Sequence, residues 1–336
     1  MFDDSSILIT GGTGSFGNAF VSHILEEYKP KKIIIFSRDE YKQHLMRQKF
    51  NETQNLKLRF LLGDVRDLER LKMAMNGVDY VIHAAALKQV PAAEYNPMEF
   101  IKTNVLGAEN VVKACLETNV KIALALSTDK AAAPCNLYGA TKLCSDKLFI
   151  AASNIKGNRD IRFCVVRYGN VMGSRGSVIP LFIKLAETGE LPITDPDMTR
   201  FNITLNEGVK FVCDCFEKMI GGEIFVPKIP SFKITDLAKA INDKMKHKLT
   251  GIRPGEKIHE EMVTATDSYN TLEFSNYFLI YPQFKYSGWN IKKYSKKNKI
   301  QKFSKVKNGF IYSSDKNKKF LSIQELKKII KNLPND

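Results

Sequence analysis

A short apolar run leads into a glycine-rich turn in Ser6-Ile7-Leu8-Ile9-Thr10-Gly11-Gly12-Thr13-Gly14-Ser15-Phe16-Gly17. The apolar run predicts a strand, and the residues after the turn predict a helix that continues towards Glu26. Glycines permit the tight turn and let the backbone approach a pyrophosphate, which rests on the positive end of the helix. A glycine-rich loop alone is a weak signal, but this one has the required strand before it and helix after it. The stretch predicts a dinucleotide site formed by Gly11, Thr13, Gly14, Ser15, Phe16 and Gly17.

Strands and helices alternate from this point up to about Arg167. Apolar runs at 32–36, 58–65, 80–86 and 121–126 predict buried parallel strands. The predicted fold is α/β, with a Rossmann-like doubly wound parallel sheet and a smaller C-terminal substrate-binding lobe. We place the nucleotide-binding domain at 1–167, a lobe mainly at 168–280 with strands returning to the core, and a lysine-rich segment at 281–336.

The second predicted strand ends in Ser37 and Arg38, where an NAD-preferring site usually offers a carboxylate. A guanidinium there suits the 2′-phosphate of NADP, and Lys42, one helical turn further on, adds positive charge. The alternative is that Arg38 pairs at the surface with Asp39 or Glu40, an interaction of about 0 to 1 kcal/mol. The pattern favours NADP as the cofactor.

The next two predicted strands offer further cofactor contacts. Asp64 follows one of them and is placed to bind the adenine. Ala84 and Ala85 follow the other, and their small side chains let a cofactor press against the backbone. His83, directly before them, is interpreted as a packed histidine at the end of a strand rather than as a catalytic base.

Two motifs follow the apolar run 121–126. Thr128, Asp129 and Lys130 occupy the carboxyl end of that strand, where ligands bind in open α/β sheets. Tyr138 and Lys142 lie at i and i+4 on one face of a predicted helix, so the ammonium should lower the pKa of the phenol. A turn or a helix surface would explain either motif alone. In tandem behind a nucleotide fingerprint, they predict an enzyme that eliminates water from a sugar.

The predicted lobe offers three arginines on loops that contain glycine or proline. They are Arg175, Arg200 and Arg253. Any one of them could be an ordinary surface residue, but three on one lobe suit a diphosphate held by bidentate hydrogen bonds. The lobe is therefore the predicted site of a diphosphate-containing substrate.

Composition narrows the protein class. The chain has 336 residues and is 44% hydrophobic, enough for one large α/β core and a smaller lobe. The first predicted strand begins almost at Met1, so we expect no secretory signal, and no apolar run approaches the roughly 20 residues of a membrane-spanning helix. Of six scattered cysteines only Cys213 and Cys215 are close, without the spacing of a zinc site. We expect a reduced, cytoplasmic protein without a metal.

The net charge of +15 is concentrated near one end of the chain. Residues 281–336 contain 15 lysines and three acidic residues, so they carry +12 of that charge. Three interpretations remain open: a solvated face, a rim that attracts an acidic substrate, and a weak patch for nucleic acid or a membrane surface. Aromatic residues are too sparse among the lysines for a base-stacking platform, so we expect no nucleic-acid partner. Ser322 and Glu325 predict a capping box on a last amphipathic helix.

These motifs resemble the extended short-chain dehydrogenase/reductases. Within them the chain is similar to the inverting UDP-N-acetylglucosamine 4,6-dehydratases that begin pseudaminic acid biosynthesis, and the resemblance covers almost the whole chain. Thr-Asp-Lys at 128–130 is the discriminating motif, because related epimerases lack the acid–base pair and retaining dehydratases usually carry Thr-Asp-Glu. Other matching segments are 10–17, 36–40, 63–67, 83–88, 94–97, 136–142, 167–171, 222–227 and 253–257.

The resemblance implies a mechanism. Tyr138, activated by Lys142, removes the proton of the C4 hydroxyl while hydride leaves C4 for NADP, and Thr128 binds the C4 oxygen. Lys130 then takes the C5 proton, and Asp129 protonates the departing C6 hydroxyl. Hydride returns to C6, and Lys130 reprotonates C5 from the opposite face. We expect burial beside a ligand, with few compensating acids, to lower the pKa of Lys130 so that a fraction is neutral.

The resemblance also implies the remaining contacts. Val65, Thr103 and Lys88 join the cofactor site, together with Tyr138 and Lys142. The substrate, UDP-N-acetylglucosamine, is expected to contact Lys88, Asn170, Val178, Thr194, Arg200, Arg253 and Glu256.

The resemblance further implies a homo-oligomer, a dimer or a hexamer, in which a helix from Pro97 to about Thr118 pairs with the Tyr138 helix. The first of these helices has an apolar stripe, formed by Ile101, Val105, Ala108, Val112 and Cys115, and core packing would equally explain it.

Two other functions remain as alternatives. A UDP-N-acetylhexosamine 4-epimerase needs Tyr138 and Lys142 but has no use for an acid and a base at C5 and C6. A non-catalytic NADP-binding regulator has no reason to combine these two residues with Asp129 and Lys130.

Overall fold

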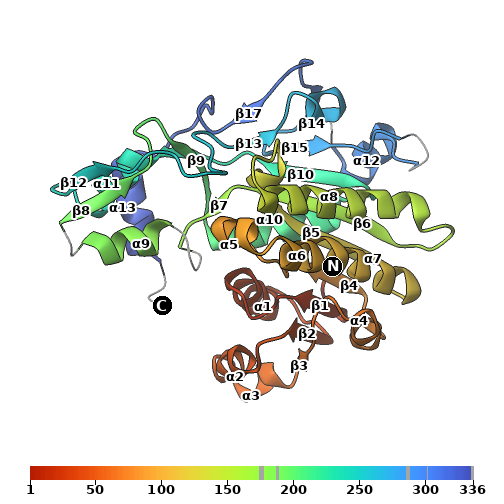
Figure 1. Cartoon of the computed structure of the whole chain (residues 1–336). Helices are drawn as coiled ribbons and strands as arrows, with labels where there is room; N and C mark the ends of the chain where they lie inside the picture. The colour runs from red at the N-terminus through yellow and green to blue at the C-terminus, as the bar shows by residue number, and fades with distance from the viewer. Residues whose placement is uncertain (174–177, 187–188, 285–287, 301, 334–336) are drawn as a thin grey trace.

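The computed structural model describes residues 1–173, 178–186, 189–284, 288–300 and 302–333. Its centre is a ten-stranded sheet in the order β16-β14-β15-β10-β6-β5-β4-β1-β2-β3 (Figure 1). The parallel strands are β1 (Ser6–Thr10), β2 (Lys32–Ser37), β3 (Leu58–Leu62), β4 (Tyr80–His83), β5 (Ile122–Thr128), β6 (Arg162–Tyr168) and β10 (Glu223–Pro227). Antiparallel strands β15 (Tyr277–Ile280), β14 (Thr271–Glu273) and β16 (Ser304–Lys305) extend one edge. The predicted α/β class and doubly wound parallel sheet are confirmed.

The sheet is buried on both faces because helices cover it. β1 shows the consequence, since Ile7, Leu8 and Ile9 are all fully buried, as the continuous apolar run requires. α4 (Leu68–Met75) packs on α7 (Gly107–Glu117), which packs on α8 (Leu137–Ile155). α1 (Ser15–Glu27) packs on α10 (Leu205–Lys218), which contacts α12 (Ile291–Asn298). Shorter helices are α2 (Glu40–Gln48), α3 (Glu52–Asn55), α5 (Val90–Tyr95) and α6 (Pro97–Phe100), with single 3₁₀ turns η2 (Asp129–Ala131) and η4 (Asp267–Asn270).

The helix predicted from Pro97 to about Thr118 is not a regular α-helix. A π-helical segment, η1 (Ile101–Leu106), lies between α6 and α7. Such segments widen one turn and occur often at functional sites. Ala108, Val112 and Cys115, from the predicted apolar stripe, are buried in the protein's own core. Core packing therefore accounts for this part of the stripe.

A second hydrophobic core stands to one side of the main sheet, on the left in Figure 1. Phe182, Leu237 and Leu326 are buried in it, from three helices that are far apart in the sequence. Its elements are α9 (Val178–Leu185), β8 (Glu190–Ile193), β11 (Ser231–Lys233), α11 (Ile234–Ile241) and α13 (Ile323–Lys331). β12 (Lys246–Leu249) pairs with β8 at the surface, and β9 (Thr199–Ile203), which pairs with β7 (Asn170–Val171) and β11, packs on the main core. β13 (Glu261–Val263) pairs with β17 (Tyr312–Ser313), and Met262, Val263 and Tyr312 of these strands are buried in the main core.

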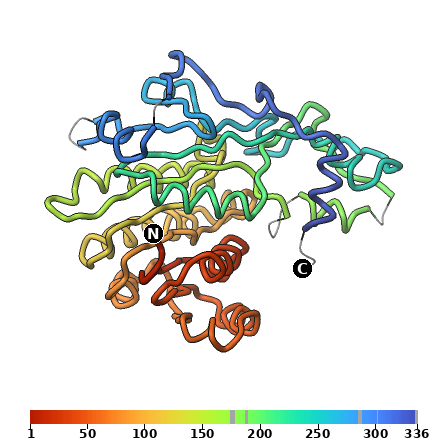
Figure 2. Tube along the Cα trace, turned by 180° about the vertical axis from the view of Figure 1, so that it is seen from behind, coloured from red at the N-terminus to blue at the C-terminus, as the bar shows by residue number. Residues whose placement is uncertain are grey.

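The lysine-rich segment 281–336 contributes to both cores. Tyr294 of α12 is fully buried in the main core and shares a hydrogen bond of 2.9 Å with Tyr277. α13 packs on α11 in the lobe, as the view from behind also shows (Figure 2). The predicted capping box is confirmed, because the Ser322 hydroxyl accepts from the Glu325 amide and the Glu325 carboxylate accepts from the Ser322 amide. The lysines of α12 and α13 thus lie on helices whose apolar sides are buried in a core.

Across the described residues, no helix combines the length and the apolarity that crossing a bilayer requires.

Candidate active site

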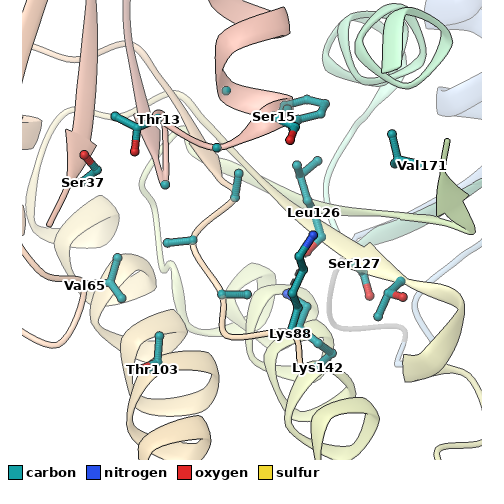
Figure 3. Close-up of a pocket in the computed structure, with 18 of the residues that line it drawn as sticks. Thr13, Ser15, Ser37, Val65, Lys88, Thr103, Leu126, Ser127, Lys142 and Val171 are labelled. Atoms are coloured by element: carbon teal, nitrogen blue, oxygen red, sulfur yellow. Dashed lines mark hydrogen bonds between the residues drawn. The ribbon is translucent and has the colours of Figure 1, made fainter. Parts of the chain in front are cut away.

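A cavity of about 910 Å³ opens at the carboxyl ends of the parallel strands. In Figure 3, Ser37 and Val65 lie on one side of it, Ser127 and Val171 lie on the other, and Lys142 is near the centre. The predicted cofactor residues all line this cavity: Gly11, Thr13, Gly14, Ser15, Phe16, Gly17, Ser37, Arg38, Lys42, Asp64, Val65, Ala84, Ala85, Lys88, Thr103, Tyr138 and Lys142. Thr128 and Lys130 line it too, as does Asn170, whereas the predicted catalytic residue Asp129 is fully buried behind them and is not among the lining residues.

The glycine-rich turn forms the floor of the cavity. Gly11 has φ +66°, and a Cβ added there would lie 2.8 Å from Ala85 Cα, so only glycine fits without strain. α1 begins at Ser15 after Gly14, with no side-chain cap on its first amides. These amides and the helix dipole suit an anion at this end of the cavity. The turn fits the pyrophosphate of a dinucleotide.

The far end of the cavity is lined by two cations, Arg38 and Lys42, and two carboxylates, Asp39 and Asp64. Arg38 is 52% exposed and lies 3.7 Å from the Asp64 carboxylate, whereas Lys42 pairs with Asp39 at 2.7 Å. The sequence analysis offered Asp39 and Glu40 as alternative partners of Arg38. In the structure Arg38 instead pairs with Asp64. Burial alone would raise the pKa of Asp64, but hydrogen bonds and charge from Arg66 lower it, with Arg38 contributing. Arg38 keeps an exposed guanidinium at the rim, as a phosphate ligand would need.

Asn104, in the π-helical segment, connects the cofactor loop to the catalytic helix. Its side chain accepts from the Leu87 amide at 2.8 Å and donates to the Leu87 carbonyl at 2.9 Å. It also donates to the Thr141 hydroxyl at 3.0 Å. The loop that carries Lys88 is thereby held against α8. The sequence analysis missed Asn104, because a π-helical segment leaves no periodic signal.

Tyr138 and Lys142 lie on α8 as predicted. Asn136 caps this helix by accepting from the Gly139 amide at 2.8 Å. A Cβ at Gly139 would overlap the Lys130 carbonyl oxygen, so glycine lets α8 lie directly against the turn that carries Asp129 and Lys130. The two motifs are therefore in contact.

The pKa of Tyr138 differs from the expectation. Burial raises it to about 12, while the charge of Lys130 lowers it and that of Asp129 raises it. Lys142 donates to the Leu126 carbonyl at 2.8 Å, and burial lowers its own pKa. The prediction that Lys142 brings the tyrosine pKa down was wrong for this geometry, because the nearby cation is Lys130.

His83 is confirmed as a packed histidine. It is buried, stacks on Phe149, and shares a hydrogen bond of 2.9 Å with the Thr10 hydroxyl. Burial, followed by the charge of Lys142, lowers the pKa of His83 to about 3, so the ring stays neutral.

Asp129 and Lys130 form the charged centre of the site. The Asp129 Oδ1 accepts from the Thr128 hydroxyl at 2.9 Å and from Lys130 Nζ at 3.1 Å. Lys130 Nζ also lies 3.4 Å from Asn170 Oδ1 and 3.2 Å from Glu260 Oε1. The Asp129 side chain is completely buried, whereas that of Lys130 is 26% exposed, and Lys130 lines the cavity.

The expected lowering of the Lys130 pKa was wrong. Burial does lower it, but the carboxylates of Asp129 and Glu260 together outweigh burial and raise the pKa above its ordinary value. Glu260 is 130 positions away in the sequence, so no local pattern could have shown it. The resting lysine is an ammonium ion.

The residues predicted to hold the UDP group are only partly assembled. Arg200 is buried, and its guanidinium donates to the carbonyls of Thr199, Ile258 and Lys257. Arg253 is 70% exposed and binds the Glu256 carboxylate at 2.8 Å. Of the predicted substrate residues, Lys88 and Asn170 line the cavity, whereas Val178, Thr194, Arg200, Arg253 and Glu256 are not among its lining residues. Arg175 lies outside the described residues.

Although it does not line the cavity, the loop 253–257 is attached to the catalytic region. The Asn136 side chain donates to the Gly255 carbonyl at 2.7 Å, and Lys257 Nζ donates to the Ala132 carbonyl at 2.8 Å. A ligand that binds this loop would therefore contact a segment that is hydrogen-bonded to the turn after Lys130. In the described part of the chain, no three His, Cys, Asp or Glu side chains gather into a metal site.

The chain matches the family described as "Polysaccharide biosynthesis protein" over residues 7–282. A relative from Campylobacter jejuni, described as UDP-N-acetylglucosamine 4,6-dehydratase (inverting), is 58% identical over 332 residues, 98% of each chain. A relative from Rickettsia canadensis, described as UDP-glucose 4-epimerase, is 48% identical over 288 residues, 83% of this chain and 84% of the relative.

Solved structures share the fold. Pen from Bacillus thuringiensis superimposes with a TM-score of 0.87 at 37% identity, covering 99% of this chain and 98% of that one. DesIV, a dTDP-glucose 4,6-dehydratase from Streptomyces venezuelae solved with NAD, has a TM-score of 0.65 at 22% identity, covering 75% and 86%, which shows a common fold. The chain belongs to the polysaccharide biosynthesis protein family and has the fold of the extended short-chain dehydrogenase/reductases.

Proposed function

We propose that this protein is a C5-inverting UDP-N-acetylglucosamine 4,6-dehydratase. The observation that carries the proposal is the contact between the acid–base pair Asp129–Lys130 and the Tyr138 helix at one end of the cofactor cavity. A 4-epimerase would need only the tyrosine and its lysine. The full-length relative from Campylobacter jejuni carries the same functional description. The product would be UDP-2-acetamido-2,6-dideoxy-β-L-arabino-hex-4-ulose.

The cavity supports a nicotinamide cofactor, and we propose NADP. Gly11 and the uncapped start of α1 would hold the pyrophosphate, and Arg38 with Lys42 would face the 2′-phosphate. When bound, the cofactor supplies the hydride acceptor at C4 and the hydride donor at C6. Because the hydride is borrowed and returned, the reaction has no net redox change.

The Tyr138 phenolate acts as the general base at C4 and takes the proton of the C4 hydroxyl. Burial opposes ionisation of this phenol, and the Lys130 ammonium favours it. Lys142 would fix the ribose and the tyrosine, and Thr128 would donate to the C4 oxygen. Tyr138 lines the cavity with Lys142 and Thr128, so all three can act on one ligand.

Asp129 and Lys130 catalyse the elimination. They share one proton across the 3.1 Å contact between Lys130 Nζ and Asp129 Oδ1. When the ammonium passes this proton to the carboxylate, the neutral amine becomes the base for C5 and the carboxylic acid becomes the donor for the C6 hydroxyl. The amine takes the C5 proton, the acid gives its proton to the hydroxyl, and water leaves. Both side chains regain their starting charges. A proton returned to the opposite face of C5 inverts that centre.

The direct test is to incubate the purified protein with UDP-N-acetylglucosamine in deuterated water and analyse the product by mass spectrometry and NMR. We expect a product lighter by one water, with deuterium at C5 and the L-arabino configuration. An epimer without loss of water would identify the alternative suggested by the Rickettsia canadensis relative. An unchanged substrate would favour the alternative of a non-catalytic NADP-binding regulator. A product with the D-xylo configuration would exclude inversion at C5.

Arg38→Asp is expected to reverse the cofactor preference. The substitution removes a guanidinium that is 52% exposed at the rim and places a second carboxylate near Asp64. Loss of a charged hydrogen-bond donor to the 2′-phosphate should weaken NADP binding by at least about tenfold, with NAD binding unchanged or improved. Isothermal titration of both cofactors measures this, and NAD serves as the internal control. Equal NADP affinity in the two proteins would contradict the assignment.

We also propose that the protein is a cytoplasmic homo-oligomer. All six cysteines are free, as in a reducing compartment. Met98 and Leu106, on the helical stretch that contains the π segment, are large apolar residues exposed to solvent, and these suit a subunit contact. Sedimentation velocity decides the matter, because a 38.1 kDa species would be a monomer.

A further inference from the structure

Glu260 is a buried acid that neither the sequence nor the relatives' descriptions single out. It lies directly before β13 and is 2% exposed. Its backbone is fixed on both sides by Ser314, whose hydroxyl accepts from the Glu260 amide at 2.9 Å and whose amide donates to the Glu260 carbonyl at 2.8 Å. The position of this side chain is therefore set by the fold.

The carboxylate of Glu260 is directed at Lys130. Its Oε1 lies 3.2 Å from Lys130 Nζ and 3.9 Å from Arg200 Nε. Its Oε2 is buried and has no hydrogen-bond partner among the described residues. A buried carboxylate is costly unless cations compensate it, so Lys130 and Arg200 stabilise Glu260, and it stabilises them.

Of these two cations only Lys130 lines the cavity. Arg200 donates to three backbone carbonyls and is fixed in place. The charged and titratable groups that face Lys130 are Asp129 from the turn after β5, Glu260 from the position directly before β13, Arg200 from β9 and Tyr138 from α8. Glu260 is thus the one acid in this set that the mechanism above leaves without a role.

We propose that Glu260 is a positioning residue for elimination, which holds the Lys130 amine at the substrate and stabilises the positive charge that Lys130 regains when it takes the C5 proton. This inference rests on the proposed function. Glu260 itself neither gains nor loses a proton, and the proton that Lys130 gives up goes to Asp129. The proton that Lys130 takes comes from C5, so the balance of the elimination is unchanged.

The proposal has a consequence for the pH dependence of one step. The pair Asp129–Lys130 works with one shared proton, and loss of that proton at high pH ends its activity. Glu260 and Asp129 raise the pKa of Lys130, so the ammonium persists to higher pH. Removing the charge of Glu260 should lower this pKa by about 1 to 3 units. The alkaline limb of the elimination step then moves to lower pH, and the amine becomes a weaker base.

The test is a single-turnover experiment on Glu260→Gln with UDP-N-acetylglucosamine and bound NADP. The rise of reduced-nicotinamide absorbance reports oxidation at C4, and its later fall reports elimination and hydride return. We expect a rise like that of the wild type and a fall slowed by about tenfold. The alkaline limb of the fall should shift down by about 1 to 3 pH units. Deuterium incorporation at C5 should slow by the same factor as the fall.

Two further variants separate charge from folding. Glu260→Asp keeps the charge on a shorter side chain, so its alkaline limb should return to the wild-type pH while the fall stays slowed. Glu261→Gln makes the same chemical change at the next residue, which is not among the groups that contact Lys130, and should behave as wild type.

Other outcomes would overturn the proposal. If Glu260→Gln had the wild-type rate of absorbance fall and the wild-type alkaline limb for the elimination step, Glu260 would not act on Lys130. If Glu260→Gln slowed the rise and the fall of the reduced-nicotinamide absorbance equally and lowered the Tm, Glu260 would only support the fold. The same conclusion would follow if Glu260→Asp did not return the alkaline limb of the elimination step to the wild-type pH. If the wild-type protein itself removes no water, the proposed function fails and this inference fails with it, a result distinct from a wild-type-like Glu260→Gln.

Discussion

Tyr138→Phe is expected to lower turnover by about 10³-fold, because it removes the group that takes the C4 hydroxyl proton. The ring is buried against α5 and α6, and phenylalanine preserves this packing. Binding of UDP-N-acetylglucosamine and of NADP should change little, since the substitution removes an interaction that matters mainly in the transition state. Single-turnover reduction of the bound cofactor measures the loss, and calorimetric titration measures the two affinities.

The matched control is Tyr80→Phe, which makes the same change at the beginning of β4, among the aromatic rings of Phe2 and Phe216. It should leave the rate of cofactor reduction unchanged. If Tyr138→Phe retained most of its activity, another group would have to be the base at C4.

Lys130→Ala is expected to stop the reaction after the first hydride transfer. Oxidation at C4 does not need this amine, whereas removal of the C5 proton does. Reduced cofactor should therefore accumulate to about one equivalent per site, and no deuterium should enter C5. Absorbance of the reduced nicotinamide and NMR of the recovered sugar measure these two results. Loss of Lys130 also leaves Asp129 and Glu260 without their shared cation, so a lower Tm is expected.

Lys147→Ala serves as its control, because Lys147 is an exposed residue of α8. This variant should complete the reaction at the wild-type rate. Normal product formation by Lys130→Ala would instead remove this lysine from the mechanism and leave Asp129 as the group to test.

Much of the cofactor cavity could be predicted because its residues follow the strand ends in sequence. Gly11, Ser37 and Ala84 each come directly after or at the end of a parallel strand, and parallel strands bring their carboxyl ends to one edge. The order of strands along the sequence therefore predicts which residues lie together at the edge of the sheet, without any knowledge of side-chain geometry. The i, i+4 spacing of Tyr138 and Lys142 is local in the same way.

The electrostatics of the site could not be predicted, because they depend on contacts between distant segments. Glu260 reaches Lys130 through the pairing of β13 with β17, and this contact reverses the direction of the expected pKa shift. Arg200 looked like a diphosphate ligand in the sequence, yet its guanidinium is directed at backbone carbonyls and at two acids. Composition and spacing carry no information about such a choice of partners.

The core of the lobe has a consequence for the timing of synthesis. The parallel strands of the main sheet are complete at Pro227, whereas α13, which covers α11, ends roughly 100 residues later, at Lys331. At the usual rate of translation this interval lasts about 5 to 20 s. During it, the apolar faces of α9 and α11 lack their third partner, and Glu260 lacks Ser314. A ribosome-bound chain can thus present the nucleotide cavity while the lobe still exposes apolar surface, to which chaperones bind and through which chains aggregate.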